Sequence, residues 1–258
     1  MRPLEISASD WDCTLEPLRL GFRLIKGLPK AAAQAIILGR RKGCYRTIAD
    51  LCRRTRLSRS LLARLAGADA FGSLGLLRRT ALWQVLAAPE EELPLFAGVA
   101  DDDMASGGCQ PPDPPLSAMP VAEEVAADYR TTGLSLKFHP LELVRSKLTG
   151  MGVTTAKALG STPAGTRLQV AGLVLVRQRP ATAKGTTFMT LEDETGTANL
   201  IVWPRVWERY RKVAGQAVAL IAHGHVERSG SVIHVCVRRL EDLSQRLRGL
   251  ASQSRDFR

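Results

Sequence analysis

Residues 188–204 read FMTLEDETGTANLIVWP. Apolar and polar residues alternate on both sides of Glu194-Thr195-Gly196, and this period of two predicts two β-strands that share one buried face. The acidic turn between them predicts a hairpin. Pro204 ends the second strand because proline has no amide to donate to a sheet. The flanking residues continue the pattern in both directions.

Three further strands are predicted around this hairpin. One precedes it at 168–176, and two follow at 217–226 and 231–238, on either side of Ser229-Gly230. A helix from Pro204 to Val213 separates the third strand from the fourth. Five strands with a helix in that place are the order of an OB-fold, a barrel that commonly holds single-stranded nucleic acid or oligosaccharide.

Residues 1–88 predict an all-α module, because short apolar stretches of helical period alternate with turn signals. Thr47, with Asp50 three residues on, is a start of the capping-box type for one helix. The helices are predicted at 18–25, 30–41, 45–56, 58–66 and 74–87.

Residues 89–120 contain seven prolines, an Asp101-Asp102-Asp103 run and Gly107-Gly108. No periodicity survives there, so a disordered acidic linker is predicted. The remaining boundaries place a helical connector at 121–165, the barrel at 166–243 and a basic tail at 244–258. The predicted fold class is therefore α+β with several domains.

The net charge of +11 is divided unevenly along the 258 residues. Residues 1–86 contain 16 Lys or Arg and 6 Asp or Glu, residues 87–130 contain 1 and 10, and residues 131–258 contain 19 and 9. Two basic bodies joined by an acidic spacer indicate two modules that face nucleic acid and a linker that repels it. A basic protein with ordinary solvated faces is the alternative.

The five cysteines are scattered without a CxxC pair, which argues against a zinc ribbon and a disulfide framework. Their odd number, and the absence of a signal peptide at the start, suit a reducing cytoplasm. No apolar run approaches the length of a membrane span, so no membrane partner is expected.

Five segments together resemble one family. Besides the 188–204 hairpin they are SDWDC (9–13), LGFRLIKGL (20–28), AGADAF (66–71) and GLSLKFHPL (133–141). Segments of this kind occur in this order in the C-terminal part of bacterial C-family DNA polymerases, the polymerase III alpha-subunit type. The chain resembles that part over nearly its full length, and it is most similar to the error-prone, damage-inducible branch.

The resemblance implies that the first module is a helix-hairpin-helix DNA-binding region with its hairpin at Ile25–Pro29. Such a hairpin aims backbone amides at a phosphate from the start of the following helix. Pro29 stands where the usual hairpin has a second glycine, which removes one donor. An ordinary turn between two core helices is the alternative. The candidate contacts are Lys26, Gly27, Lys30, Arg40 and Arg41.

In the implied OB domain, Arg177, Arg179 and Lys184 are expected around the first loop, a common strand-contacting edge. Phe188 and Trp203 lie on the second and third strands, where stacking contributes about 1–3 kcal/mol per base. The period alone does not decide whether Phe188 or Met189 faces outward, and Trp203 fits the surface or the core.

Glu92-Leu93-Pro94-Leu95-Phe96 resembles the short linear motif by which these polymerases hold the sliding clamp. Leu93, Leu95 and Phe96 would then fill an apolar groove of the clamp. A stray apolar tetrapeptide in a linker is the alternative.

No catalytic or metal-binding residue is assigned. Polymerisation needs two metal ions held by aspartates, and in the family these lie upstream of the resembling region. Glu192, Asp193 and Glu194 are consecutive in a hairpin turn, where neighbours point to opposite faces. His223, His225 and His234 would come together if the last hairpin turned at Ser229-Gly230, although paired surface histidines are commoner. No cofactor is expected here, and Mg²⁺ is expected only for the complete polymerase.

The resemblance thus implies the DNA-binding C-terminal part of an error-prone DNA polymerase that acts in translesion replication and repair in the bacterial cytoplasm. The implied partners are single-stranded or primer–template DNA, the sliding clamp and accessory proteins of error-prone repair. By itself the chain should bind DNA and should not polymerise. The alternatives are a stand-alone nucleic-acid-binding or clamp-recruitment module, and an OB module that serves another partner such as tRNA.

Overall fold

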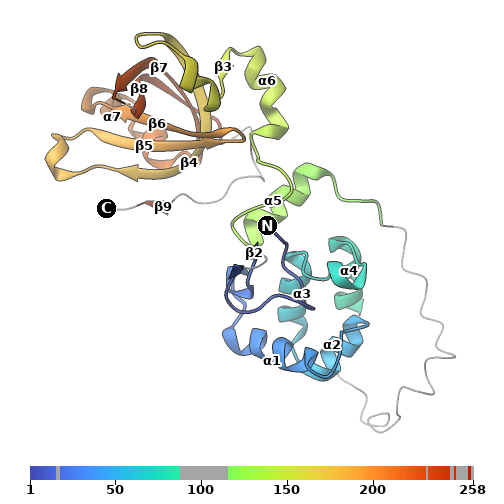
Figure 1. The fold of residues 1–258 in the computed structure, drawn as a ribbon. Coiled ribbons are helices and arrows are strands. Elements are labelled where there is room, and N and C mark those ends of the chain that lie inside the picture. Colours follow the sequence, from blue (N-terminus) through green and yellow to red (C-terminus); the bar gives the residue numbers. More distant parts are fainter. Residues whose placement is uncertain (16–17, 88–115, 231, 245–246, 248–254, 257–258) are drawn as a thin grey trace, which may run out of the picture. The chain divides into compact units, whose positions relative to one another are not determined.

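The computed structural model describes residues 1–15, 18–87, 116–230, 232–244, 247 and 255–256. The chain divides into two units, traced in Figure 1. The first comprises Met1–Pro120 with Thr131–Gly133, and the second comprises Val121–Arg130 with Leu134–Arg258.

The first unit is predominantly helical, as predicted. A short ladder joins β1 (Thr14–Leu15) to β2 (Leu18–Arg19). The helical elements are η1 (Phe22–Leu24), α1 (Lys30–Arg40), α2 (Ile48–Thr55), α3 (Arg59–Gly67), η2 (Gly72–Leu74) and α4 (Arg78–Ala87). The largest side chains buried in this unit are Ile6, Phe22, Ile36, Leu51, Leu65 and Phe71.

The predicted start of α2 is confirmed by its cap. Thr47 Oγ1 accepts the amide of Asp50 at 3.0 Å, and the Asp50 carboxylate accepts the amide of Arg46 at 3.2 Å. These bonds satisfy amides that have no partner inside the helix.

The helix predicted at 18–25 is wrong except for the three residues of η1. The amides of Phe22 and Arg23 donate to the carbonyls of Asp10 and Trp11, at 2.7 and 2.9 Å, instead of continuing a helical ladder. Gly21 allows this approach, since a Cβ there would lie 2.3 Å from the carbonyl carbon of Asp12. A contact with the lead-in residues has therefore overridden the local apolar pattern.

The second unit contains a closed five-stranded barrel, and its strand order confirms the OB-fold. The strands are β4 (Arg167–Gln178), β5 (Thr187–Asp193), β6 (Gly196–Val202), β7 (Ala219–Ser229) and β8 (Val232–Asp242). Neighbours follow the order β4–β5–β6–β8–β7, and β4 also pairs with β7, which closes the barrel (Figure 1). Alternate residues fill the interior, among them Val170, Met189, Leu200, Leu220 and Val235.

The helix between the third and fourth strands of the barrel is present but divided. Instead of one helix from Pro204 to Val213, α7 (Pro204–Arg209) and α8 (Arg211–Gln216) meet at Tyr210. Tyr210 leaves the helical conformation, with φ −113° and ψ 27°, and packs against the barrel core.

The register of the β7–β8 hairpin differs from the predicted one, in which a turn at Ser229-Gly230 would place His225 opposite His234. Ser229 pairs with Val232, so the connection begins at Gly230, whose φ of +60° is the left-handed value that tight hairpin turns require. His225 consequently lies opposite Cys236, and His234 lies opposite Glu227. A shift of one residue in the turn has separated the imidazoles that the sequence placed opposite each other.

The helical connector packs on the outside of the barrel. It comprises α5 (Val121–Thr131), η5 (Glu142–Val144), α6 (Arg145–Gly150), β3 (Val153–Thr154) and η6 (Lys157–Ser161), and β3 extends the sheet parallel to β4. A second core joins Val125, Leu141 and Leu148 to outward residues of β4 and β7 such as Leu173 and Ile221. A two-residue strand, β9 (Arg255–Asp256), also pairs with β4. Among the described residues, no helix is long and apolar enough to cross a membrane.

Candidate nucleic-acid interface

The hairpin of the first unit is a tight turn at Ile25–Leu28. The Leu28 amide donates to the Ile25 carbonyl at 3.2 Å, and Gly27 has φ +75°. A type II turn requires a positive φ at its third residue, and Gly27 occupies that position. Pro29 follows as the N-cap of α1, with φ −67°, so the turn leads directly into the first helical amides.

Lys26 and Lys30 are exposed beside this turn, and Arg41 is exposed at the opposite end of α1. Arg40 differs, because its guanidinium donates to the Ser9 carbonyl at 2.8 Å and pairs with the Asp10 carboxylate. Arg40 therefore ties the lead-in to α1.

Sequence reasoning did not single out Arg64, which reaches the hairpin from α3. Its Nη1 donates to the Lys26 carbonyl at 3.1 Å. The guanidinium lies so close to Gly27 that a Cβ there would be 2.3 Å from Nη1. No local pattern marks this residue, because it is 38 positions from its partner in the sequence.

On the barrel, the structure decides which aromatic rings face outward. Phe188 is 37% exposed, whereas the neighbouring Met189 is 1% exposed and fills the core. Trp203 is 50% exposed at the end of β6. Phe188 pairs with Ile201 near the open end of the β5–β6 hairpin, and Trp203 directly follows β6 at the same end as the N-cap of α7.

The first loop of the barrel, residues 179–186, is held against α7. The Arg179 guanidinium lies over the Trp207 ring, 5.6 Å from its centroid. Lys184 has φ +48°, a left-handed conformation that non-glycine residues rarely adopt, and Gly185 follows with φ +83°. Strain of this kind persists only where the surroundings enforce it, and it is commonest at ligand-binding sites. Trp207 was not among the predicted residues, although its spacing of four from Trp203 places both on one side of a helix start.

Arg177 does not lie in this loop, and its predicted placement is wrong. It belongs to β4, is only 8% exposed, and its Nε donates to the Ala214 carbonyl at 2.7 Å. A second bond runs from Nη2 to the Ala217 carbonyl. The guanidinium thus satisfies the carbonyls at the end of α8, which have no helical partner, and it anchors α8 to the barrel.

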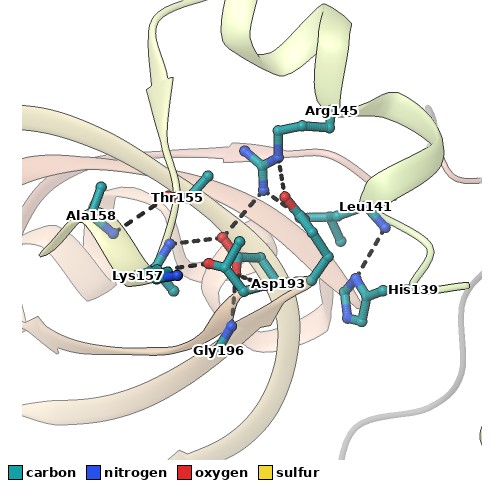
Figure 2. Close-up of polar contacts among 11 residues, drawn as sticks. His139, Leu141, Arg145, Thr155, Lys157, Ala158, Asp193 and Gly196 are labelled. Carbon is teal, nitrogen blue, oxygen red and sulfur yellow. Dashed lines mark hydrogen bonds and ion pairs between the residues drawn. The ribbon is translucent and has the colours of Figure 1, made fainter. Parts of the chain in front are cut away.

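The acidic turn of the β5–β6 hairpin is a structural site. Asp193 is 4% exposed and accepts the amides of Thr195, Gly196 and Ala156 at 2.8, 3.1 and 2.8 Å. Arg145, on α6, donates to both Asp193 and Glu194. Figure 2 shows these contacts converging on Asp193 from the turn and from the connector. The carboxylates are occupied by protein donors and fasten the connector to the barrel.

His139 lies beside this site, where its Nδ1 accepts the Leu141 amide at 3.2 Å (Figure 2). Burial lowers the pKa of His139 below its usual range, and Glu192, Glu194, Asp193 and Glu142 act in the opposite direction. The turn of the 133–141 segment is therefore built around a neutral imidazole.

Comparisons with known proteins find relatives of the helical unit and of the whole chain. Residues 1–81 match the family described as the helix-hairpin-helix motif. The error-prone DNA polymerase 1 of Rhizobium meliloti is 41% identical over 100% of this chain and 25% of the relative. The error-prone DNA polymerase of Rhodopirellula baltica is 46% identical over 93% of this chain and 21% of the relative.

The chain is homologous to the C-terminal part of error-prone DNA polymerases. It spans about a quarter of the length of these curated relatives. Among solved structures, the asparaginyl-tRNA synthetase from Pyrococcus horikoshii is 20% identical over 40% of this chain and 24% of that chain, with a TM-score of 0.31. The OB-fold is assigned from the strand order and not from this likeness.

Two other sets of predicted residues are the clamp motif and the histidines of the last hairpin. The clamp-motif residues Leu93, Leu95 and Phe96 lie outside the described residues. His223 Nε2 contacts Glu241 Oε1 at 2.8 Å, and within the described part of the chain no group of three or more His, Cys, Asp or Glu could hold a metal ion.

Proposed function

We propose that this region is the DNA-handling part of an error-prone DNA polymerase and that it acts during translesion replication and repair. The barrel binds the single-stranded template, and the helix-hairpin-helix unit binds the sugar–phosphate backbone. The homologous polymerases are error-prone enzymes by name, which supports the error-prone role. Nucleotide transfer is assigned to the parts of those relatives that this chain does not span.

One observation carries the proposal for the barrel. Phe188, near the start of β5, and Trp203, directly after β6, are both exposed, and the loop before β5 carries the exposed cations Arg179 and Lys184. Large rings beside cations are the elements of a single-strand site, because bases stack on the rings and phosphates pair with the cations. Exposing two rings to water is otherwise unfavourable.

The experiment is a titration of fluorescent oligo(dT) by fluorescence anisotropy over a series of salt concentrations. Log K should fall with log salt by about 0.7 for each phosphate neutralised. The double variant Phe188→Ala with Trp203→Ala should bind about thirtyfold more weakly or worse, because two rings at about 1–3 kcal/mol each lose at least about 2 kcal/mol of stacking. Trp83→Ala is the matched control, since Trp83 is 49% exposed on α4 of the other unit.

Binding that is absent or insensitive to salt would refute the nucleic-acid function. Equal losses in the double variant and in the Trp83 control would move the site away from the β5–β6 face.

We also propose sliding-clamp attachment through Leu93, Leu95 and Phe96, on the strength of the motif alone. Leu95→Ala combined with Phe96→Ala should abolish clamp capture while oligo(dT) affinity stays unchanged. Clamp capture by the double variant would exclude this motif.

A further inference from the structure

The hairpin lacks one backbone donor because Pro29 has no amide hydrogen. The guanidinium of Arg64 contacts the same turn at Lys26 and Gly27. We infer that Arg64 contacts the phosphate at this hairpin and supplies a hydrogen-bond donor in place of the amide that Pro29 lacks. This inference rests on the proposed DNA binding of the first unit. The ligand is a phosphodiester of the nucleic-acid backbone, recognised without reference to base sequence.

Arg64 is placed by its position in α3 and by two contacts with the turn. It lies in the last turn of α3, its Nη1 donates to the Lys26 carbonyl at 3.1 Å, and its guanidinium rests on Gly27. A single carbonyl uses only one of the five N–H groups of a guanidinium. The side chain is exposed, so the remaining donors of the planar group can meet a phosphate in the paired geometry that arginine favours.

The charge balance of the first unit indicates that Arg64 is not an internal ion-pair residue. All five acidic residues that the structure describes between residues 1 and 87 pair with other arginines. These pairs are Arg19–Glu5, Arg40–Asp10, Arg23–Asp12, Arg54–Asp50 and Arg78–Asp69. Among the described residues, no carboxylate pairs with Arg64. Its charge therefore adds to the surface potential at the hairpin, beside Lys26 and Lys30.

Gly27 has a second role in this arrangement. Its φ of +75° suits the turn, and its missing Cβ makes room for the guanidinium, since a Cβ would lie 2.3 Å from Nη1. Ala at this position would displace Arg64 as well as strain the turn. The effects of changing the two residues on DNA binding should therefore not be additive.

The test is a double-mutant cycle on the full chain with primer–template DNA, measured by anisotropy in a salt series. Arg64→Ala should weaken binding about tenfold, the size expected of a charged hydrogen bond. It should also reduce the salt slope by about 0.9. Arg64→Lys should restore the slope but only part of the affinity, because an ammonium group cannot form the paired bonds. After Gly27→Ala, Arg64→Ala should have little further effect.

Arg46→Ala is the matched control, because Arg46 is an exposed arginine at the start of α2. Its effect should add to that of Gly27→Ala. Equal effects of Arg64→Ala and Arg46→Ala, or full additivity of Arg64→Ala with Gly27→Ala, would overturn the role of Arg64. If Gly27→Ala does not fold, the Arg64→Lys comparison alone decides. Failure of the unaltered chain to bind DNA would instead refute the proposed function.

Discussion

The two ends of the β5–β6 hairpin use charged residues in opposite ways. At the turn end, Arg145 holds Asp193 and Glu194, and backbone amides also donate to Asp193 (Figure 2). Asp193 is almost fully buried. At the open end, Arg179 and Lys184 are exposed on the loop that precedes β5, and Lys184 keeps a left-handed backbone. The charged groups of the turn end have partners within the protein, and those of the open end face solvent.

This difference separates stability from binding. Buried carboxylates with several donors stabilise the native state because their loss leaves those donors unpaired. Exposed cations and rings contribute little to folding, and in the proposed function they bind the nucleic acid. Substitutions at the turn end should therefore change the free energy of unfolding, and substitutions at the open end should change DNA affinity and its salt dependence.

The largest effect is expected from Asp193→Ala. The change removes the acceptor of three amides and one partner of Arg145, so it should destabilise the second unit by about 3 kcal/mol. Urea unfolding followed by tryptophan fluorescence measures this loss. Oligo(dT) affinity, measured where the variant is still folded, should be unchanged. A variant that is equally stable but binds DNA more weakly would show that the turn end serves binding and not stability.

Two neighbouring arginines offer a paired test. Arg177→Met leaves the Ala214 and Ala217 carbonyls without their charged donor, and it should cost about 2 kcal/mol of stability with no change in the salt slope. Arg179→Met removes one cation–π contact worth about 0.5–1 kcal/mol and should reduce the slope by about 0.7. Urea unfolding and salt-dependent anisotropy of both variants provide the comparison. A smaller salt slope for Arg177→Met would indicate that Arg177 contacts the DNA after all.

Lys184→Asn should separate charge from backbone conformation. Asparagine tolerates the left-handed region, so stability should stay within about 0.5 kcal/mol. The lost charge should reduce the salt slope for oligo(dT) by about 0.7. Lys212→Asn, an exposed lysine on α8, is the control for general charge. An equal change in the two variants would mean that the first loop has no special part in binding.

The smallest effect concerns pH at the turn end. Burial lowers the pKa of His139, so the folded state favours the neutral ring. Its contribution is therefore complete above the unfolded pKa of about 6.5 and is lost as the pH falls toward the lower folded pKa. In thermal melts between pH 7 and 5, His139→Asn should flatten this decline, because its side-chain oxygen can accept the Leu141 amide at the same spacing. A parallel decline in both proteins would exclude His139 as the titrating group.

Much of the fold could be predicted from the sequence because its signals are local. The alternation on both sides of Glu194-Thr195-Gly196 specified the hairpin, and Thr47 with Asp50 specified the start of α2. Prediction failed where a distant contact or the exact position of a turn decided the local structure. Gly21 packs on the backbone of residues 11 and 12, Tyr210 divides a helix by turning toward the core, and the turn beginning at Gly230 shifts the last hairpin by one residue.

The sequence by itself determined the OB-fold hairpin, the separation of basic and acidic regions, and the homologous family, because periodicity, charge and motif order are properties of the chain. Only the tertiary structure decided the role of each charged side chain. Arg177 and Arg179 are two residues apart, yet one is buried on carbonyls and the other lies on a tryptophan ring. Arg64 meets Gly27 only because α3 folds back onto the hairpin. The free energy of a charge depends on its burial and partners, and these are fixed by packing between residues far apart in the sequence.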